Sequence, residues 1–193
     1  MAKTKASSDL FDIMKTRLEG IRKLLDDMDE SVAEQLIQML LHARRIFATG
    51  KGRSGYIADS FAMRLMQMGF DAHVPGEATC PCIRRGDVMV AVSCSGTTAT
   101  TVQFARISRD SGAQVVAVTA VADSPLASIA HLVVLVPVTE RDVKKSYRYV
   151  LGPHNNTLFE EALLLYFDGM VYSMLTREGI SKDLLSRRHT NLE

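Results

Sequence analysis

The sequence has too few cysteines for a disulfide framework. Only three occur in 193 residues, and an odd number cannot all pair within one chain. Cys80 and Cys82 are separated by a single residue, which is a poor spacing for a disulfide. Unpaired thiols are typical of a reducing compartment, and we therefore expect a cytoplasmic protein.

The sequence also lacks a membrane segment and an excess of one charge. Residues 1–5 carry charge, but no apolar stretch follows them, and the longest apolar runs, such as residues 132–138, are far too short to span a bilayer. The formal net charge of +1 argues against a surface that binds nucleic acid. We expect neither a membrane nor a nucleic acid as a partner.

The apolar content is sufficient for one substantial core. Hydrophobic residues make up 47% of the chain and charged residues 23%, as in an ordinary globular protein, and no internal repeat is present. We expect a single domain over residues 1–193, with N-terminal helices in 1–43, a parallel-sheet core in 44–137, and C-terminal helices and a tail in 157–193.

The spacing of apolar residues predicts two helices and then alternating strands and helices. Residues 9–28 have helical periodicity, and Ser31 and Glu34 have the spacing of a capping box, which predicts a second helix from there to about residue 43. Short apolar runs then alternate with helical patterns, as in βαβ units around a parallel sheet. The predicted strands lie near residues 45–49, 72–75, 87–93, 114–119 and 132–137, and the helices between them near 55–69, 97–112 and 124–130.

The C-terminal part predicts a long helix over residues 158–175 that is apolar almost all round. Such a helix is buried on more than one side, which favours a subunit interface. The polar residues 140–156 before it predict a long loop that forms a wall of the site, and residues 182–187 predict a short final helix. The fold class is therefore α/β, a flavodoxin-like three-layer sandwich with a five-stranded parallel sheet, two N-terminal helices and a long C-terminal helix.

Two loops at the ends of predicted strands can bind a ligand. Residues 93–98 read Ser-Cys-Ser-Gly-Thr-Thr between a strand and a helix, so hydroxyls and free backbone N–H groups converge on one point, as a phosphate requires. Helix capping alone would need fewer hydroxyls than this loop has. Residues 50–55 fit the pattern GxGxxG after the first strand, and in a flavodoxin-like sheet both loops meet where the strand order reverses.

The GxGxxG pattern leaves a dinucleotide site as one alternative. That interpretation needs an acidic residue after the second strand to hold a ribose, for which Glu77 is the candidate. Lys51 and Arg53 crowd a turn that a pyrophosphate site usually keeps small, and a second anion loop has no role in dinucleotide binding. A monophosphate on a small polar body explains both loops together.

Three further residues could move protons. Glu160 and Glu161 begin the apolar helix, where carboxylates also simply complement the helix dipole. His189 lies in a polar tail that could be solvated, or could serve as an acid or base in a neighbouring subunit.

These blocks together resemble the sugar isomerase (SIS) domain family. The resemblance rests on residues 46–55, on Phe-Ala-Met-Arg-Leu-Met at 61–66, on Gly-Glu-Ala-Thr at 76–79, on residues 93–98, and on Arg-His-Thr-Asn-Leu at 188–192. It covers nearly the whole chain from about residue 40. Within the family, the sequence is most similar to the branch of 6-phospho-3-hexuloisomerases.

The resemblance implies interconversion of 3-hexulose 6-phosphate and fructose 6-phosphate, the step after formaldehyde fixation in the ribulose monophosphate pathway, without a metal or redox cofactor. It implies Glu160 as the base that works through a cis-enediolate, with Glu161 and Glu77 as rivals. It also implies a homo-oligomer, a dimer or tetramer, with active sites at subunit interfaces. His189 is then the ring-opening group in the site of a neighbouring subunit. The implied phosphate- and sugar-binding residues are Gly52, Arg53, Ser54, Ser93, Ser95, Gly96, Thr97 and Thr98.

The chain departs from the family pattern at three points. Cys94 stands between the serines of the phosphate loop, Lys51 stands where a small residue is common, and the loop before Phe159, which contains His154, is one residue longer.

Two other functions within the same family stay open. An isomerase of arabinose 5-phosphate would have a lysine in place of Arg53 and a His-Gly pair after Glu77, which this sequence lacks. A non-catalytic sugar-phosphate-binding regulator would carry a DNA-binding helical domain in front, and the first 40 residues do not resemble one.

Overall fold

The structure is a computed structural model that describes residues 10–138, 155–177, 182–189 and 191. Most of the predicted loop at 140–156, including His154, lies outside the described residues.

Five parallel strands form one sheet in the order β2-β1-β3-β4-β5. They are β1 (Ile46–Thr49), β2 (Ala72–His73), β3 (Val88–Val92), β4 (Gln114–Thr119) and β5 (Leu132–Leu135). This confirms the flavodoxin-like α/β fold. The order reverses between β1 and β3, whose register pairs Ile46 with Val88 and Thr49 with Ala91.

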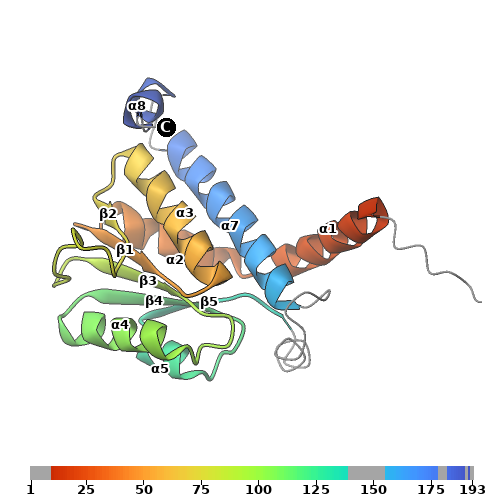
Figure 1. The fold of residues 1–193 in the computed structure, drawn as a ribbon, viewed down its shortest axis with the longest axis horizontal. Coiled ribbons are helices and arrows are strands. Elements are labelled where there is room, and N and C mark those ends of the chain that lie inside the picture. The colour runs from red at the N-terminus through yellow and green to blue at the C-terminus, as the bar shows by residue number, and fades with distance from the viewer. Residues whose placement is uncertain (1–9, 139–154, 178–181, 190, 192–193) are drawn as a thin grey trace, which may run out of the picture.

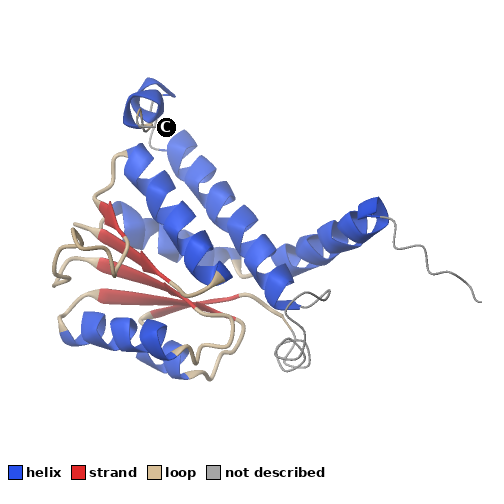
Figure 2. Ribbon diagram, in the orientation of Figure 1, coloured by secondary structure: helices blue, strands red, loops and turns tan. Residues whose placement is uncertain are grey.

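Helices cover both faces of the sheet (Figures 1 and 2). One face packs against α3 (Arg53–Met68), α2 (Glu30–Leu41), α1 (Leu10–Asp26) and α7 (Asn155–Arg177). The other face packs against α4 (Ala99–Asp110) and α5 (Pro125–Ile129). Because both faces are covered, all five residues of β3 are buried. This burial explains why the strand is a continuous apolar run in the sequence, from which it is predicted.

The second helix begins earlier than the predicted capping box places it. Asp29 is the N-cap, and its carboxylate accepts a hydrogen bond of 2.8 Å from the backbone N–H of Ser31. Helix α2 therefore begins at Glu30, and Ser31 lies inside its first turn. The prediction of Ser31 as the cap is wrong because an aspartate two residues earlier satisfies the same free N–H groups.

Helix α7 is the centre of the helical layer. Phe167 stacks on Phe61 of α3 with 4.0 Å between ring centroids, and Phe159, Leu163 and Met174 are buried. At its N-terminal half α7 crosses α1, which projects from the body of the molecule (Figure 1). Large apolar side chains stay exposed on both helices: Leu10, Phe11, Ile13, Met14 and Leu18 on α1, and Leu164, Leu165 and Tyr172 on α7.

The short helix α8 (Lys182–Arg188) packs against α3. None of the described helices is both long enough and apolar enough to cross a membrane. Cys80, Cys82 and Cys94 are all free thiols.

Candidate active site

The 50–55 loop leads from β1 into the first turn of α3 with open backbone N–H groups. Gly52 is the N-cap of α3, has a φ of +60°, and provides no side chain to bond to the helix. Gly50 lies so close to the next turn that a Cβ there would be 2.7 Å from the backbone oxygen of Ser54. The first N–H groups of a helix have no partner within it, so this end of α3 can bind an anion.

The 93–98 loop presents its hydroxyls in pairs at the start of α4. Ser93 Oγ lies 2.9 Å from Thr98 Oγ1, and Ser95 Oγ lies 2.8 Å from Thr97 Oγ1. Thr98 is the N-cap of α4 but makes no side-chain cap bond, because its hydroxyl is paired with Ser93. Capping of α4 therefore does not explain these hydroxyls.

Gly96 fixes the shape of the 93–98 loop by close packing. Its φ is +64°, and a Cβ at this position would lie 2.1 Å from Ser124 Oγ and 3.0 Å from Thr119 Oγ1. Its carbonyl accepts a hydrogen bond of 3.0 Å from the N–H of Leu126. Thr119 and Ser124 thus support the loop from β4 and α5. Neither residue is predicted as part of the site, because the turn that brings them to Gly96 is not visible in the local sequence pattern.

Glu160 comes from α7 and reaches the 50–55 loop. Its side chain is only 9% exposed, with Oε2 2.5 Å from Arg53 Nε and Oε1 3.4 Å from Ser54 Oγ. Arg53 itself is 62% exposed. Burial, and secondarily the charge of Glu160, raises the pKa of the Cys94 thiol to about 12, so Glu160 also lies near the 93–98 loop. The structure therefore brings Glu160, Arg53 and Ser54 together at the end of the sheet where the strand order reverses.

Glu161 and Glu77 lie elsewhere. Glu161 accepts hydrogen bonds of 2.9 and 2.7 Å from Nε and Nη2 of Arg17, and this pair joins α7 to α1. Glu77 is exposed on the turn after β2, and its charge adds to burial in raising the pKa of Asp59 on α3. Neither carboxylate shares the contacts with Arg53 and Ser54 that Glu160 makes.

His189 is held at the other end of α3 from Glu160. It follows α8, where Arg188 Nη1 lies 3.5 Å from the carbonyl oxygen of Met66 in the last turn of α3. Glu160 contacts the first turn, and 16 helical residues span about 24 Å. Within one chain, His189 therefore does not reach the Glu160 carboxylate.

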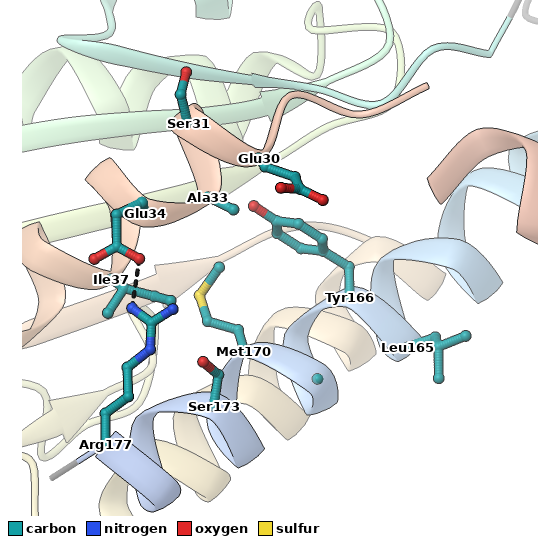
Figure 3. Close-up of a pocket in the computed structure, with 11 residues that line it drawn as sticks. Glu30, Ser31, Ala33, Glu34, Ile37, Leu165, Tyr166, Met170, Ser173 and Arg177 are labelled. Carbon is teal, nitrogen blue, oxygen red and sulfur yellow. Dashed lines mark hydrogen bonds and ion pairs between the residues drawn. The ribbon is translucent and has the colours of Figure 1, made fainter. Parts of the chain in front are cut away.

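A cavity of about 640 Å³ lies between α2 and α7, away from the two loops (Figure 3). Glu34 and Arg177 form an ion pair at one end, and the hydroxyl of Tyr166 is buried without a hydrogen-bond partner. The lining includes Leu165 and Met170 and none of the predicted site residues.

The described residues contain no group of three or more His, Cys, Asp or Glu side chains that could hold a metal ion. The predicted independence from metals stays a prediction.

Comparisons with known proteins agree on one family. A family model for the SIS domain matches residues 39–184. The chain is 33% identical to a 3-hexulose-6-phosphate isomerase of Bacillus subtilis over 93% of this chain and all of the relative. It is also 33% identical to a 3-hexulose-6-phosphate isomerase of Mycobacterium gastri over 86% of this chain and 82% of the relative.

A solved structure from Methanococcus jannaschii has the same fold, with a TM-score of 0.79 and 28% identity over 95% of this chain and 98% of that one. For that protein, a molecular function of 3-hexulose-6-phosphate isomerase has been inferred.

Proposed function

The chain belongs to the SIS domain family, and we propose that this isomerase interconverts 3-hexulose 6-phosphate and fructose 6-phosphate. The observation that carries the proposal is the contact of the buried Glu160 carboxylate with Arg53 and Ser54, beside two helix N-termini. This contact supports a site in which Glu160 transfers a proton beside an anion-binding helix N-terminus. The names of the relatives from Bacillus and Mycobacterium support the choice of substrate.

The substrate would lie across the ends of β1 and β3. The phosphate would be held at the start of α4, where the hydroxyls of Ser93, Ser95, Thr97 and Thr98 lie in two hydrogen-bonded pairs beside the helix N-terminus. The sugar would extend towards the 50–55 loop, where Gly52 leaves the backbone open. In this orientation the reacting carbons of the sugar would lie near Glu160.

Glu160 would transfer the proton. Its carboxylate removes a proton from the carbon next to the carbonyl, and the electron pair moves to give a cis-enediolate between C2 and C3. The same carboxyl group then returns the proton to the neighbouring carbon, and the hydroxyl proton passes between O2 and O3. The carbonyl thus moves by one position and no electrons leave the substrate. Arg53, with its guanidinium beside Glu160, would stabilise the negative charge on the enediolate oxygen.

His189 would act in a neighbouring subunit of a homo-oligomer. In its own chain, His189 follows the contact of Arg188 with the last turn of α3, whereas Glu160 contacts the first turn of this helix, which is about 24 Å long. The exposed apolar side chains of α1 and α7 give each subunit surfaces that another copy could cover. An imidazole can act as either acid or base, as ring opening of the cyclic sugar phosphate requires.

The test is a coupled assay that detects fructose 6-phosphate formed from 3-hexulose 6-phosphate. We expect turnover that persists in EDTA, and a metal requirement would contradict the mechanism. Arabinose 5-phosphate is assayed in parallel, because turnover of that sugar alone would assign another isomerase of the family. Tight binding of both sugar phosphates without turnover would indicate a regulator instead.

A further inference from the structure

The 50–55 loop carries two cations whose surroundings differ. The guanidinium of Arg53 is engaged by Glu160 at 2.5 Å. Lys51, two residues earlier, has no carboxylate within 4 Å of its ammonium group among the residues that the structure describes. Within the described part of the chain, Arg53 is therefore paired with the proposed catalytic carboxylate, whereas Lys51 has no carboxylate partner and can bind an incoming anion.

Lys51 lies across the end of β1, between helices from opposite faces of the sheet. Its Nζ is 6.0 Å from the centroid of the Phe104 ring of α4. Long side chains on a helix lean towards its N-terminus, so this ring faces the end of α4 where the 93–98 loop lies. The charge of Lys51 also opposes the effects of burial and Glu77 on the pKa of Asp59, which places the ammonium group near α3 as well.

Among the residues that the structure describes, no other full positive charge is assigned to the predicted phosphate position. The hydroxyls of the 93–98 loop are neutral, and the N-terminus of α4 contributes only about half an elementary charge. A sugar phosphate near neutral pH carries close to two negative charges. A flexible lysine with three donors can reach such a group from the neighbouring loop.

We propose that Lys51 binds the phosphate of the substrate, while Arg53 remains with Glu160 and the enediolate. The inference rests on the proposed function, because it divides one site between phosphate binding and proton transfer. Lys51 then determines affinity for phosphorylated sugars in general, and it contributes little to the chemical step. Its role is positioning, not catalysis.

The experiment compares Lys51→Met and Lys51→Arg with the wild-type protein and with Lys23→Met. Lys23 is an exposed lysine in the last turn of α1, so its replacement removes one ammonium group without touching either loop. Calorimetric titrations with inorganic phosphate and with fructose 6-phosphate give Kd, and the coupled assay gives kcat and KM separately. Titrations at two NaCl concentrations test the charge directly, because salt screens an exposed ion pair.

We expect Lys51→Met to raise Kd for both probes about tenfold, as for the loss of one charge-assisted hydrogen bond. In the same variant, Kd should depend less on the NaCl concentration, and kcat should fall less than threefold. Lys51→Arg should keep most of the affinity, and Lys23→Met should match the wild type. Unchanged Kd in Lys51→Met would overturn the inference, as would a loss of kcat at unchanged KM.

The two proposals fail separately. If the wild-type protein turns over no sugar phosphate but Lys51→Met still loses affinity for inorganic phosphate, the proposed reaction is wrong and the role of Lys51 stands. If turnover is as proposed and Lys51→Met binds phosphate normally, only the role of Lys51 is wrong.

Discussion

Glu160 and Glu161 are adjacent on α7, yet they contact different parts of the molecule. Glu160 is paired with Arg53 at the start of α3, and Glu161 is paired with Arg17 on α1. Successive residues on a helix point about 100° apart, so one carboxylate faces the 50–55 loop and the other faces the N-terminal helix. The first lies in the candidate site, and the second joins two helices.

Replacing Glu160 by glutamine should remove the reaction without unfolding the protein. The amide keeps the shape of the side chain and can still accept a hydrogen bond from Ser54, but it cannot take a proton. We expect kcat to fall by about 10² or more in the coupled assay. Glu161→Gln is the matched control and should stay within about threefold of the wild type. If the Glu160→Gln enzyme were fully active, Glu161 or Glu77 would be the base instead.

The pair between Arg17 and Glu161 should stabilise the contact of α1 with α7. Arg17 bonds both oxygens of Glu161, the two side chains are about a fifth and a third exposed, and the shortest N to O distance is 2.7 Å. A double-mutant cycle with Arg17→Met and Glu161→Gln should give a coupling free energy of about 1 kcal/mol in chemical denaturation. A coupling near zero would show that packing alone holds α1.

Two glycines with positive φ should differ in their tolerance of alanine. Both substitutions incur a backbone penalty of about 1–3 kcal/mol. At Gly52 a Cβ meets nothing within 4 Å, whereas at Gly96 it would overlap Ser124. We expect Gly96→Ala to lower the free energy of unfolding by about 2 kcal/mol more than Gly52→Ala, measured by urea denaturation. Equal losses would mean that the loop moves away from Ser124 at little cost.

Alkaline pH should destabilise the fold through two buried acids. Burial raises the pKa of Cys94 from 9.0 to about 12 and that of Tyr166 from 10.0 to about 12. The unfolded chain therefore loses these protons first, and the free energy of unfolding falls as pH rises from about 9 to about 12. Tyr166→Phe should make this fall shallower above pH 10, by at most about 1.4 kcal/mol per pH unit. Identical pH profiles for the variant and the wild type would contradict the prediction.

The fold could be predicted because its signals are local. The apolar run of β3 ends at small hydroxyl residues, and α7 is apolar on almost every side, so a buried parallel strand and a buried helix follow from adjacent residues. The residue at which a helix or strand begins or ends is harder to predict, because neighbouring residues compete for the same role. Asp29 caps α2 in place of Ser31, and β2 is only two residues long at the edge of the sheet, before Pro75.

The candidate site could be predicted only as a set of loops. Sequence places Ser93 and Arg53 at strand ends, but the partner of Arg53 lies 107 residues away. Whether Glu160 or Glu161 faces the loops depends on how α7 is rotated against α3 and α1, and that rotation is decided by tertiary packing. The distance of His189 from its own site likewise follows from where α8 packs on α3.

Co-expression of two inactive variants should test whether His189 acts across subunits. Glu160→Gln and His189→Asn should each lower the rate by about 10² or more as separate proteins. If each site combines Glu160 of one chain with His189 of another, a mixed dimer carries one site with both groups intact and one with neither. Random pairing leaves about a quarter of all sites intact, so the mixture should recover about a quarter of the wild-type activity. The double variant expressed with the wild type provides the control. Its mixed dimers contain no intact site, so the wild-type dimers alone leave about a quarter of all sites intact, whereas about half would stay intact if each chain used its own His189. If the mixture stayed as inactive as its components while the two chains co-purified, His189 would have no role in a neighbouring site.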